Sequence, residues 1–495
     1  MTTDGRRTSV GQLPTPDGET SRVPAALTRL VWLLWVASLG VLVAFASGGG
    51  PWRVGDLFVV DGLTVLLWAA VTFFSGIVHS YSRRYMAGDE RIDRFFGGVF
   101  AFTLVVATLV AANHFAAFWA AWLAMGLVMA ELIGHVREWP QARAAAALAR
   151  RYFLGGAALL AVALGTLWWT TGTATVAGVP AGVADASQTV LLVVAVALVL
   201  AAMVQSALLP FHTWLLSSMT APTPASALMH AGFVNAGGVL LVRFAPVVTA
   251  DARVMLAIAA VGATSAIGGK LLKTVRADVK GELGCSTVGQ MGFMILQAGL
   301  GFFAAAIAHL VLHGFYKAYQ FLGSGSRVAH ESPRDGGPDR ATTPLGVLST
   351  IVTALAGGAL FAVLTGKGTK AGTGLVLTML VVLTGLHAAR DFAARTSLSA
   401  TVRYAAVPLI ALPAIAVYAG VYVAFTRLLH PLPGVGDPAT LSAGHAVLAA
   451  AFVGAYLLVE SGLYRRSRRL YVTLLNGTVP PAETHLTTTE DYDEH

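Results

Sequence analysis

Long apolar runs separated by short polar stretches repeat along almost the whole chain. A helix that crosses a bilayer needs about 20 mostly apolar residues, because each residue adds only about 1.5 Å to its length. Runs of this kind predict about fourteen membrane-spanning helices. They cover residues 26–46, 57–81, 95–112, 114–134, 153–172, 188–208, 225–246, 253–271, 283–300, 303–324, 345–365, 372–389, 403–426 and 444–463. The pattern therefore predicts an all-α polytopic membrane protein.

One stretch interrupts this pattern with prolines. An apolar helix runs into Pro210 and then into Pro222 and Pro224, and the helix that follows carries His230. Proline removes a backbone donor and breaks the helical hydrogen-bond ladder. In lipid such a break is tolerated only where protein or a water-filled cavity satisfies the freed groups. A broken helix next to an intramembrane histidine indicates an ion or proton pathway.

The composition agrees with a membrane protein and limits the chemistry. The 495 residues are 56% hydrophobic and 12% charged, whereas soluble proteins carry about 25% charged residues. The single cysteine, Cys285, excludes an intramolecular disulfide and a cysteine-built metal cage. The sequence contains no phosphate-binding glycine loop, nucleophile elbow or HExxH pattern. We therefore expect a transporter subunit rather than an enzyme, with no cofactor in this chain.

The net charge of +8 comes from basic residues that recur between the apolar runs. Basic loops mark the cytoplasmic side of a membrane protein, and an N-terminus on that side places most of the arginine clusters there. The clusters are Arg83, Arg84, Arg91 and Arg94; Arg137, Arg143, Arg150 and Arg151; Lys273, Arg276 and Lys280; Arg327, Arg334 and Arg340; Arg390, Arg395 and Arg403; and Arg465, Arg466, Arg468 and Arg469. We expect both termini to be cytoplasmic.

Three titratable residues share one face of a predicted span. His309, His313 and Lys317 are spaced at i, i+4 and i+8, which places them on one side of a helix. Contact of the lysine with lipid would cost several kcal/mol, so the face should point into the bundle. Histidines titrate near neutral pH and can accept and donate protons. We interpret this set as a proton relay; the alternative is a structural set held by hydrogen bonds.

Other polar residues have two interpretations each. His230 either belongs to the pathway or bonds a carbonyl that the break frees. We expect His212 near the membrane edge, where it has either a pathway role or a structural role. Lys280 is either a pathway residue or a topology signal. Glu131 either hands protons over or forms a structural ion pair with Arg137. We expect no metal at the histidines, because no third carboxylate or cysteine ligand is near them in the sequence.

Several long motifs resemble a known family. They are DGLTVLLWAAVTFFSGIVHSYSRRYMAGDERIDRFF (61–96), LPFHTWLLSSMTAPTPASALMHAG (209–232), ADVKGELGCSTVGQMGF (277–293) and HLVLHGFYKAYQFLGSGS (309–326). They resemble the antiporter-like membrane subunits of respiratory complex I, chiefly NuoL, and their relatives in Mrp antiporters and membrane hydrogenases. The resemblance covers about residues 55–390. It implies two inverted five-helix repeats, each with a broken helix, and the second break is expected near Gly357 and Gly358.

The resemblance implies a division of the chain into six parts. These are a disordered cytoplasmic tail (1–25), N-terminal transmembrane helices (26–94), a first antiporter-like repeat (95–248), a second repeat (252–389), C-terminal transmembrane helices (390–463) and a cytoplasmic tail (464–495).

Within this superfamily, the segments APTPASALMHAGFVNAGG, STVGQMGFMILQAGLGFFAAAIAHLVLHGFYKA and LYVTLLNG (470–477) resemble the DabB subunits of inorganic carbon pumps. In that family DabB pairs with DabA, a cytoplasmic zinc protein similar to a β-carbonic anhydrase. The resemblance implies a DabA-like partner that carries the zinc, and an H+ or Na+ gradient that drives carbon uptake.

Two positions depart from the respiratory pattern. Respiratory members have a glutamate after the tryptophan that corresponds to Trp122, where this chain has Leu123. They also have a lysine where this chain has Gln205. The missing Glu–Lys pair argues against a conventional first half-channel. The family's histidines and lysines are matched by His230, Lys280, His309, His313 and Lys317, and more weakly by Lys367.

The sequence therefore predicts a bacterial cytoplasmic-membrane subunit that conducts H+ or Na+ and energises inorganic carbon uptake by a DabA-like partner. One alternative is a proton-translocating subunit of a respiratory, hydrogenase or Mrp-type complex. Another is a secondary transporter that functions alone.

Overall fold

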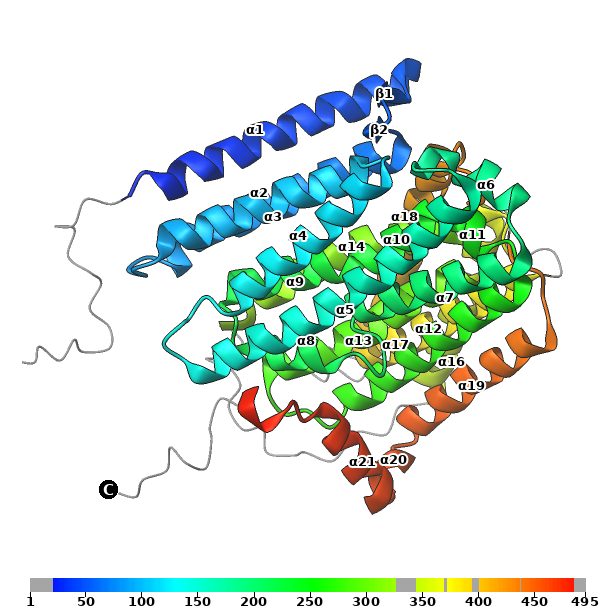
Figure 1. Cartoon of the computed structure of the whole chain (residues 1–495). Coiled ribbons are helices and arrows are strands. Elements are labelled where there is room, and N and C mark those ends of the chain that lie inside the picture. Colours follow the sequence, from blue (N-terminus) through cyan, green and yellow to red (C-terminus); the bar gives the residue numbers. More distant parts are fainter. Residues whose placement is uncertain (1–20, 326–343, 369–371, 394–399, 437, 485–495) are drawn as a thin grey trace, which may run out of the picture.

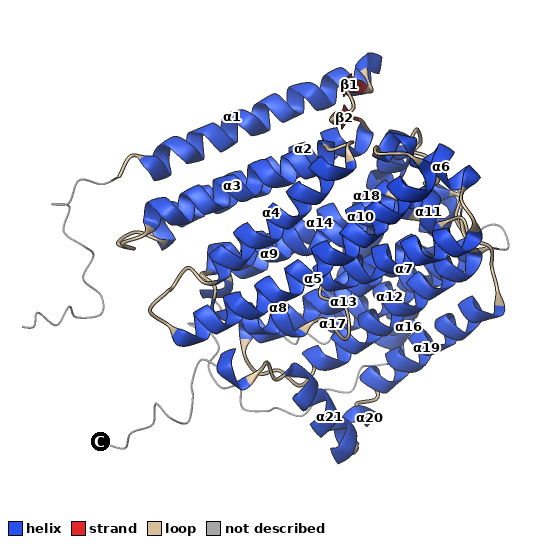
Figure 2. Cartoon of the chain, viewed as in Figure 1, coloured by secondary structure: helices blue, strands red, loops and turns tan. Residues whose placement is uncertain are grey.

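Long helices packed side by side build the structure, with most of them running between the same two ends of a bundle (Figure 1). The computed structural model describes residues 21–325, 344–368, 372–393, 400–436 and 438–484. Figure 2 shows that helix dominates these residues. The N-terminal tail expected to be disordered lies mostly outside the described residues, as do the last eleven residues, 485–495.

The helices and strands have the following bounds. They are α1 (Val23–Ala44), η1 (Phe45–Gly49), β1 (Trp52–Val54), β2 (Phe58–Val60), α2 (Gly62–Tyr85), α3 (Ile92–Ala111), α4 (Phe115–Ile133), α5 (Pro140–Thr171), η2 (Val176–Gly178), α6 (Val179–Asp185), α7 (Gln188–Gln205), α8 (Thr213–Ser217), η3 (Ser218–Thr220), α9 (Thr223–Ala231), η4 (Phe233–Asn235), α10 (Ala236–Arg243), α11 (Ala245–Val248), α12 (Ala252–Lys273), α13 (Val279–Gly299), α14 (Phe303–Leu322), α16 (Pro344–Thr365), α17 (Thr373–Ala393), α18 (Ala400–Leu429), α19 (Ala443–Glu460), α20 (Leu463–Arg466), α21 (Arg468–Thr478) and η5 (Ala482–Thr484).

Each of the fourteen predicted spans coincides with a long helix or, for residues 225–246, with the broken helix α9–η4–α10. Within the described part of the chain, eleven helices are long and apolar enough to cross a membrane. Helices α13, α14 and α17 fall outside that set, and the first two carry the polar residues of interest. The prediction of an all-α polytopic membrane protein is confirmed, with one small addition. The strands β1 and β2 pair as an antiparallel hairpin between α1 and α2.

The predicted break at Pro210 is present, and neighbouring groups satisfy the backbone that it frees. Helix α7 ends at Gln205, and the chain passes through residues 206–212 before α8 begins. The indole of Trp214 donates to the carbonyl of Val204 at 2.9 Å, and the amide of Leu209 donates to the Ser265 hydroxyl at 3.1 Å. These side chains satisfy the freed backbone groups without water, which a helix break inside a bilayer requires.

The second helix of this region is also interrupted, at Gly232 between α9 and η4. The Asn235 amide donates to the carbonyl of Ala231 at 2.7 Å, and the Ser206 hydroxyl donates to the carbonyl of Val234, also at 2.7 Å. Ser206 follows the end of α7, so the two broken helices satisfy each other. Gly237 permits this approach, because a Cβ there would lie 2.3 Å from the Ser206 hydroxyl oxygen.

The predicted second break near Gly357 and Gly358 is wrong, because α16 runs without interruption from Pro344 to Thr365. Glycine lowers helix stability by only about 1 kcal/mol and removes no backbone donor, unlike proline. The two glycines instead make room for neighbours: a Cβ would lie 2.4 Å from Ile415 of α18 at one position and 2.3 Å from Val382 of α17 at the other.

Helices α12 and α13 pack so closely that their glycines touch backbone. A Cβ at Gly269 would lie 2.2 Å from the amide nitrogen of Gly289, and a Cβ at Gly292 would lie 2.3 Å from that of Ala266. Small residues allow this approach, because packing rather than hydrophobicity joins helices in lipid. This glycine seam fixes α13, which supplies one wall of the candidate site.

We call the end of the bundle that holds the α2–α3 and α4–α5 loops the basic end, because the arginine clusters of α2, α3 and α5 lie there. The C-terminal helices α20 and α21 follow α19 at this end as well (Figure 1). Leu474 of α21 is buried, and the carbonyl of Gly477 lies 2.9 Å from Nε2 of His212. The C-terminal segment is therefore folded onto the bundle, beside the Pro210 break.

A buried ion pair holds the opposite end of the bundle. Asp61 caps α2 by accepting a hydrogen bond from the amide of Thr64, and its carboxylate pairs with Arg243 at the end of α10. Arg243 also donates to the Thr64 hydroxyl at 2.8 Å. Burial alone would raise the pKa of Asp61, but the attraction and hydrogen bonds of Arg243, with the Thr64 bonds, hold it below its usual value.

Candidate functional site

The centre of the candidate site is Lys317, which is fully buried on α14. Its ammonium donates to the carbonyl of Leu283 on α13 at 2.9 Å. Lys317 is in none of the ion pairs of the described residues, and the acceptor that holds its ammonium is a neutral backbone carbonyl. A buried lysine held in this way can change its charge at modest cost, which suits proton transfer.

The same carbonyl links Lys317 to a histidine on another helix. The Thr287 hydroxyl donates to the carbonyl of Leu283 at 2.9 Å and lies 2.9 Å from Nδ1 of His230. Because its hydrogen is engaged with Leu283, the hydroxyl accepts from Nδ1–H of His230. That tautomer leaves Nε2 of His230 as a bare acceptor, and this atom is buried without a partner among the described residues. The acceptor of His230 is thus a side-chain hydroxyl rather than a carbonyl freed by the break.

His313 and His309 continue the line along α14. Their rings stack with centroids 5.9 Å apart, and the His309 ring lies 5.4 Å from that of Phe293 on α13. Within the described structure, both ring nitrogens of His313 and Nε2 of His309 are buried without a hydrogen-bond partner. Each such group costs about 1–3 kcal/mol, so these histidines are poor structural residues and well placed to take up a proton or an ion.

Lys280 lies at the basic end of this line, in the first turn of α13. Its ammonium donates to the carbonyl of Ala221 at 3.1 Å and to that of Met219 at 3.4 Å. Both carbonyls belong to the segment that follows α8, so the lysine joins α13 to the region of the Pro210 break. The structure thus brings five predicted residues into one series. From the basic end it runs Lys280, Lys317 with His230, His313 and His309.

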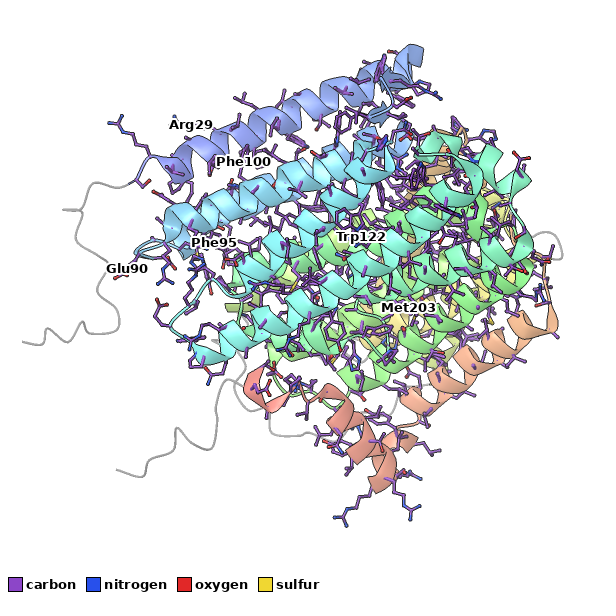
Figure 3. All side chains as sticks on the ribbon, in the orientation of Figure 1. Arg29, Glu90, Phe95, Phe100, Trp122 and Met203 are labelled. Carbon is purple, nitrogen blue, oxygen red and sulfur yellow. The ribbon has the colours of Figure 1, made fainter. Side chains whose placement is uncertain are left out.

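Glu131 is placed elsewhere. Its carboxylate is half exposed and pairs with three arginines, Arg94, Arg137 and Arg150, at 3.0–3.2 Å. Figure 3 labels Glu90 at the basic end of the bundle and Trp122 in its middle. The geometry at Glu131 is that of the structural ion pair that the sequence left as one of two interpretations.

The positions where respiratory relatives carry the Glu–Lys pair hold uncharged side chains. Gln205, at the end of α7, is buried and its amide lies 3.5 Å from the carbonyl of Phe233. Leu123 is partly buried against the apolar core. Trp122 is also buried. The chain therefore carries no charge at these two positions.

The sequence interpretation missed one chain of hydrogen bonds near the basic end. Lys270 Nζ lies 2.7 Å from Nε2 of His387, whose Nδ1 lies 2.8 Å from a Glu460 carboxylate oxygen. These residues come from α12, α17 and α19, so no local spacing relates them. Thr287 was missed as well, although its place seven residues after Lys280 puts both on one face of α13.

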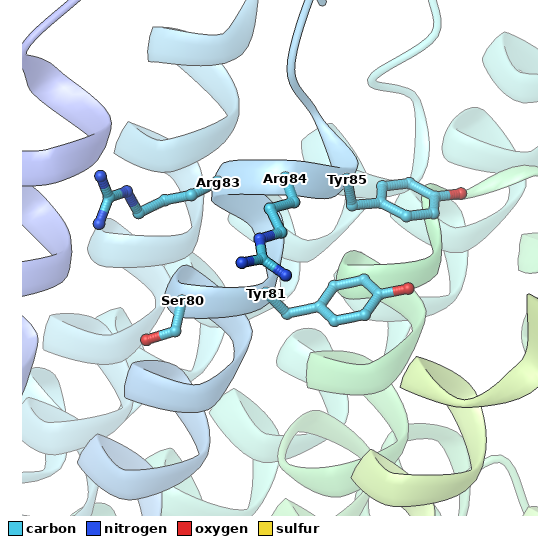
Figure 4. Close-up of a pocket in the computed structure, with 5 residues that line it drawn as sticks. All are labelled: Ser80, Tyr81, Arg83, Arg84 and Tyr85. Atoms are coloured by element: carbon cyan, nitrogen blue, oxygen red, sulfur yellow. The ribbon is translucent and has the colours of Figure 1, made fainter. Parts of the chain in front are cut away.

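A surface pocket of about 870 Å³ lies at the end of α2 (Figure 4). It is lined by Ser80, Tyr81, Arg83, Arg84 and Tyr85. None of these residues belongs to the buried series. In the described part of the chain, no three histidine, cysteine, aspartate or glutamate side chains come together as metal ligands would.

The structure defines a class of protein: a multi-pass helical membrane protein with a buried series of titratable residues along paired helices. The chain belongs to the family described as "NADH:quinone oxidoreductase/Mrp antiporter, TM", whose sequence profile matches residues 112–402. The profile of the N-terminus of complex I chain 5 matches residues 52–96.

Two curated relatives illustrate the similarity. The chain is 38% identical over 308 residues to a probable inorganic carbon transporter subunit, DabB1, of Halothiobacillus neapolitanus. The aligned segment covers 59% of this chain and 53% of the relative. It is also 38% identical over 272 residues to NADH-quinone oxidoreductase subunit L of Mycobacterium tuberculosis, covering 54% and 43%. The chain spans about half the length of the curated relatives that it matches.

A solved structure supports the fold. The Mrp complex from Dietzia sp. aligns over 92% of this chain and 49% of the other, with a TM-score of 0.54 and 23% sequence identity. The chain therefore has the fold of an antiporter-like subunit.

Proposed function

We propose that this chain is the membrane subunit of an energy-coupled inorganic carbon uptake pump. It conducts H+ or Na+ through the series from Lys280 to His309, and the flow drives a soluble partner of the DabA type that takes up CO2 or bicarbonate. Any zinc and any hydration of CO2 belong to that partner. The protein lies in the cytoplasmic membrane of a bacterium, with both termini and the basic end on the cytoplasmic side.

The observation that carries this proposal is the buried position of Lys317 between Leu283 and the unpartnered histidines. Ionisable groups in a membrane interior are costly and mark substrate or proton paths. The similarity to probable inorganic carbon transporter subunits supports the carbon substrate. The uncharged residues at Leu123 and Gln205 support a pump that differs from the respiratory type.

A respiratory or Mrp-type complex is the second candidate, because the identity to NADH-quinone oxidoreductase subunit L is equally high at 38%. Affinity purification from the native membrane separates the two. Co-purification of one soluble zinc protein supports the carbon pump, whereas a set of several membrane and redox subunits contradicts it.

The pathway itself is tested with Lys317→Met. Methionine keeps a similar length and apolar packing but cannot carry a proton. We expect this variant to lose cation flux in proteoliposomes and growth that depends on inorganic carbon, while it still inserts and binds its partner.

Lys273→Met is the matched control, because Lys273 makes a half-exposed ion pair with Glu282 at 3.1 Å. It should transport normally. Normal flux in Lys317→Met at normal expression would show that the pathway does not use this lysine.

A further inference from the structure

The series of titratable residues ends at His309, but polar groups continue beyond it on α13. Gln297 is fully buried and lies one helical turn beyond Phe293, whose ring contacts His309. One turn is about 5.4 Å along the axis, in the direction away from the basic end. Gln297 is therefore the next polar side chain along the wall that α13 supplies.

Gln297 is paired with a residue from a third helix. Its amide nitrogen donates to the hydroxyl oxygen of Tyr418 on α18 at 3.2 Å. The amide oxygen, Oε1, is buried without a hydrogen-bond partner among the described residues. The Tyr418 O–H stays available as a donor, because the oxygen accepts from Gln297. The pair thus presents one bare acceptor and one donor next to the end of the histidine series.

The position of the pair matches the length of a membrane path. Lys280 and Gln297 lie near opposite ends of α13, and their separation of 17 positions corresponds to about 25 Å along the helix axis. A bilayer core is about 30 Å thick. Lys367, in the loop that follows α16, lies beyond the pair. Its ammonium is 5.2 Å from the centre of the Phe302 ring.

We propose that Gln297 and Tyr418 form the station that receives the transported cation from His309 and passes it toward the end of the bundle opposite the basic end. An amide oxygen and a phenolic oxygen stabilise a hydrated proton or a sodium ion through their dipoles, without a permanent charge that would trap it. The pair itself is unchanged after each passage. This inference rests on the proposed function and assigns the part of the path that follows the histidines.

The test compares Gln297→Leu and Tyr418→Phe with two matched controls. Gln290→Leu makes the same change at an exposed position of α13, and Tyr422→Phe makes the same change one turn along α18. Each variant is purified with its co-purifying subunits and reconstituted in proteoliposomes. Proton flux is followed with a pH dye and sodium flux with a radioactive tracer, in buffers with and without sodium.

We expect the two station variants to lose flux about tenfold, the equivalent of one hydrogen bond of about 1.4 kcal/mol in the path, and the controls to keep it. The double variant should lose no more than either single one, because the two groups act as a unit. A loss in sodium-free buffer assigns a proton to the station, whereas a loss of sodium flux alone assigns sodium.

Lys317→Met is measured in parallel. If it is inactive while both station variants transport normally, the station is overturned and the proposed function stands. If Lys317→Met transports normally, the conducting series in the proposed function fails, whatever the station variants show. If Gln297→Leu does not insert into the membrane, two milder variants decide whether the station takes part in transport. They are Gln297→Met and Tyr418→Phe, of which the second removes a single oxygen. Additive losses in the double variant would overturn the pairing.

Discussion

A single backbone carbonyl organises the centre of the site. Leu283 accepts hydrogen bonds from both Lys317 and Thr287, and Thr287 in turn accepts from His230. Three helices are therefore joined at one acceptor, and three short hydrogen bonds link Lys317 to His230, so a change in the charge of Lys317 alters the surroundings of His230. Buried networks of this kind depend on every member.

Thr287→Val tests this link. Valine keeps the shape of threonine but leaves Nδ1–H of His230 without an acceptor, so the histidine loses its fixed tautomer. We expect cation flux in proteoliposomes to fall several-fold, with normal insertion, and Thr287→Ser to restore it. Normal flux in the valine variant would show that the orientation of His230 does not matter for transport.

A second residue-scale prediction concerns the Asp61–Arg243 pair. Removing one partner of a buried ion pair costs about 3–5 kcal/mol. Asp61→Asn keeps a capping side chain but leaves Arg243 uncompensated, so we expect a clearly lower thermal unfolding temperature in detergent. Because the pKa of Asp61 is lowered in the folded state, the pair stabilises the protein above the usual pKa of an aspartate, and this contribution is lost as the pH falls through the folded-state pKa.

Asp251→Asn is the control for that experiment. Asp251 also caps a helix and pairs with an arginine, Arg253, but this arginine is largely exposed. Solvent screens exposed pairs strongly, so this variant should unfold at nearly the unchanged temperature. Equal losses in the two variants would mean that the cap, rather than the buried charge, matters.

At the scale of residues, the sequence predicted which titratable side chains share a helix face, but it did not predict their hydrogen-bond partners on other helices. His309, His313 and Lys317 share a helix face because the spacing is local, and the structure turns two of them, His313 and Lys317, into the core. Their contacts lie on α13, the helix directly before α14 in the sequence, whereas the tyrosine on α18 is 121 positions from its partner Gln297. A periodic pattern carries no information about which helix lies opposite, so Thr287, Gln297 and Tyr418 could not be paired from sequence.

At the scale of elements, proline and glycine differ in whether they break a helix. Pro210 predicted a break because it lacks a backbone donor, and the break is there. Gly357 and Gly358 were expected to break α16, but glycine only weakens a helix, and here it provides space for α17 and α18. The structure has a helix at each of the fourteen predicted spans, although α13, α14 and α17 are not among the eleven described helices that are long and apolar enough to cross a membrane.

The glycine seam between α12 and α13 gives an element-scale prediction. Gly292→Leu places a side chain where a Cβ alone would lie 2.3 Å from the backbone of Ala266, so the helices must separate. We expect a strong loss of folded protein in detergent, measured by size-exclusion chromatography. Gly155→Leu, in α5, has open space around the added Cβ and should behave like the unchanged protein. A well-folded Gly292→Leu protein would contradict the packing argument.

At the scale of the whole molecule, the C-terminal segment has an inward and an outward face. Leu474 is buried on the bundle, whereas Tyr471, Val472 and Leu475 of the same helix are exposed. Removing residues 468–478 should therefore lower the unfolding temperature as well as any partner binding. Tyr471→Ala should leave the unfolding temperature unchanged, so a loss of co-purification in this variant would place the partner on α21. Unchanged co-purification in both variants would remove α21 from the interface.

The hydrogen bond between His212 and Gly477 also has a consequence for biosynthesis. The two residues are 265 positions apart. At roughly 5–20 residues per second, the carbonyl that meets His212 is made roughly 10–50 s after the histidine itself. The region around Pro210 must therefore wait in the membrane with its final contact missing. A ribosome stalled shortly before Gly477 would hold a nearly complete bundle in this unfinished form, and that window is when an assembly factor or a partner subunit has its best access to the break.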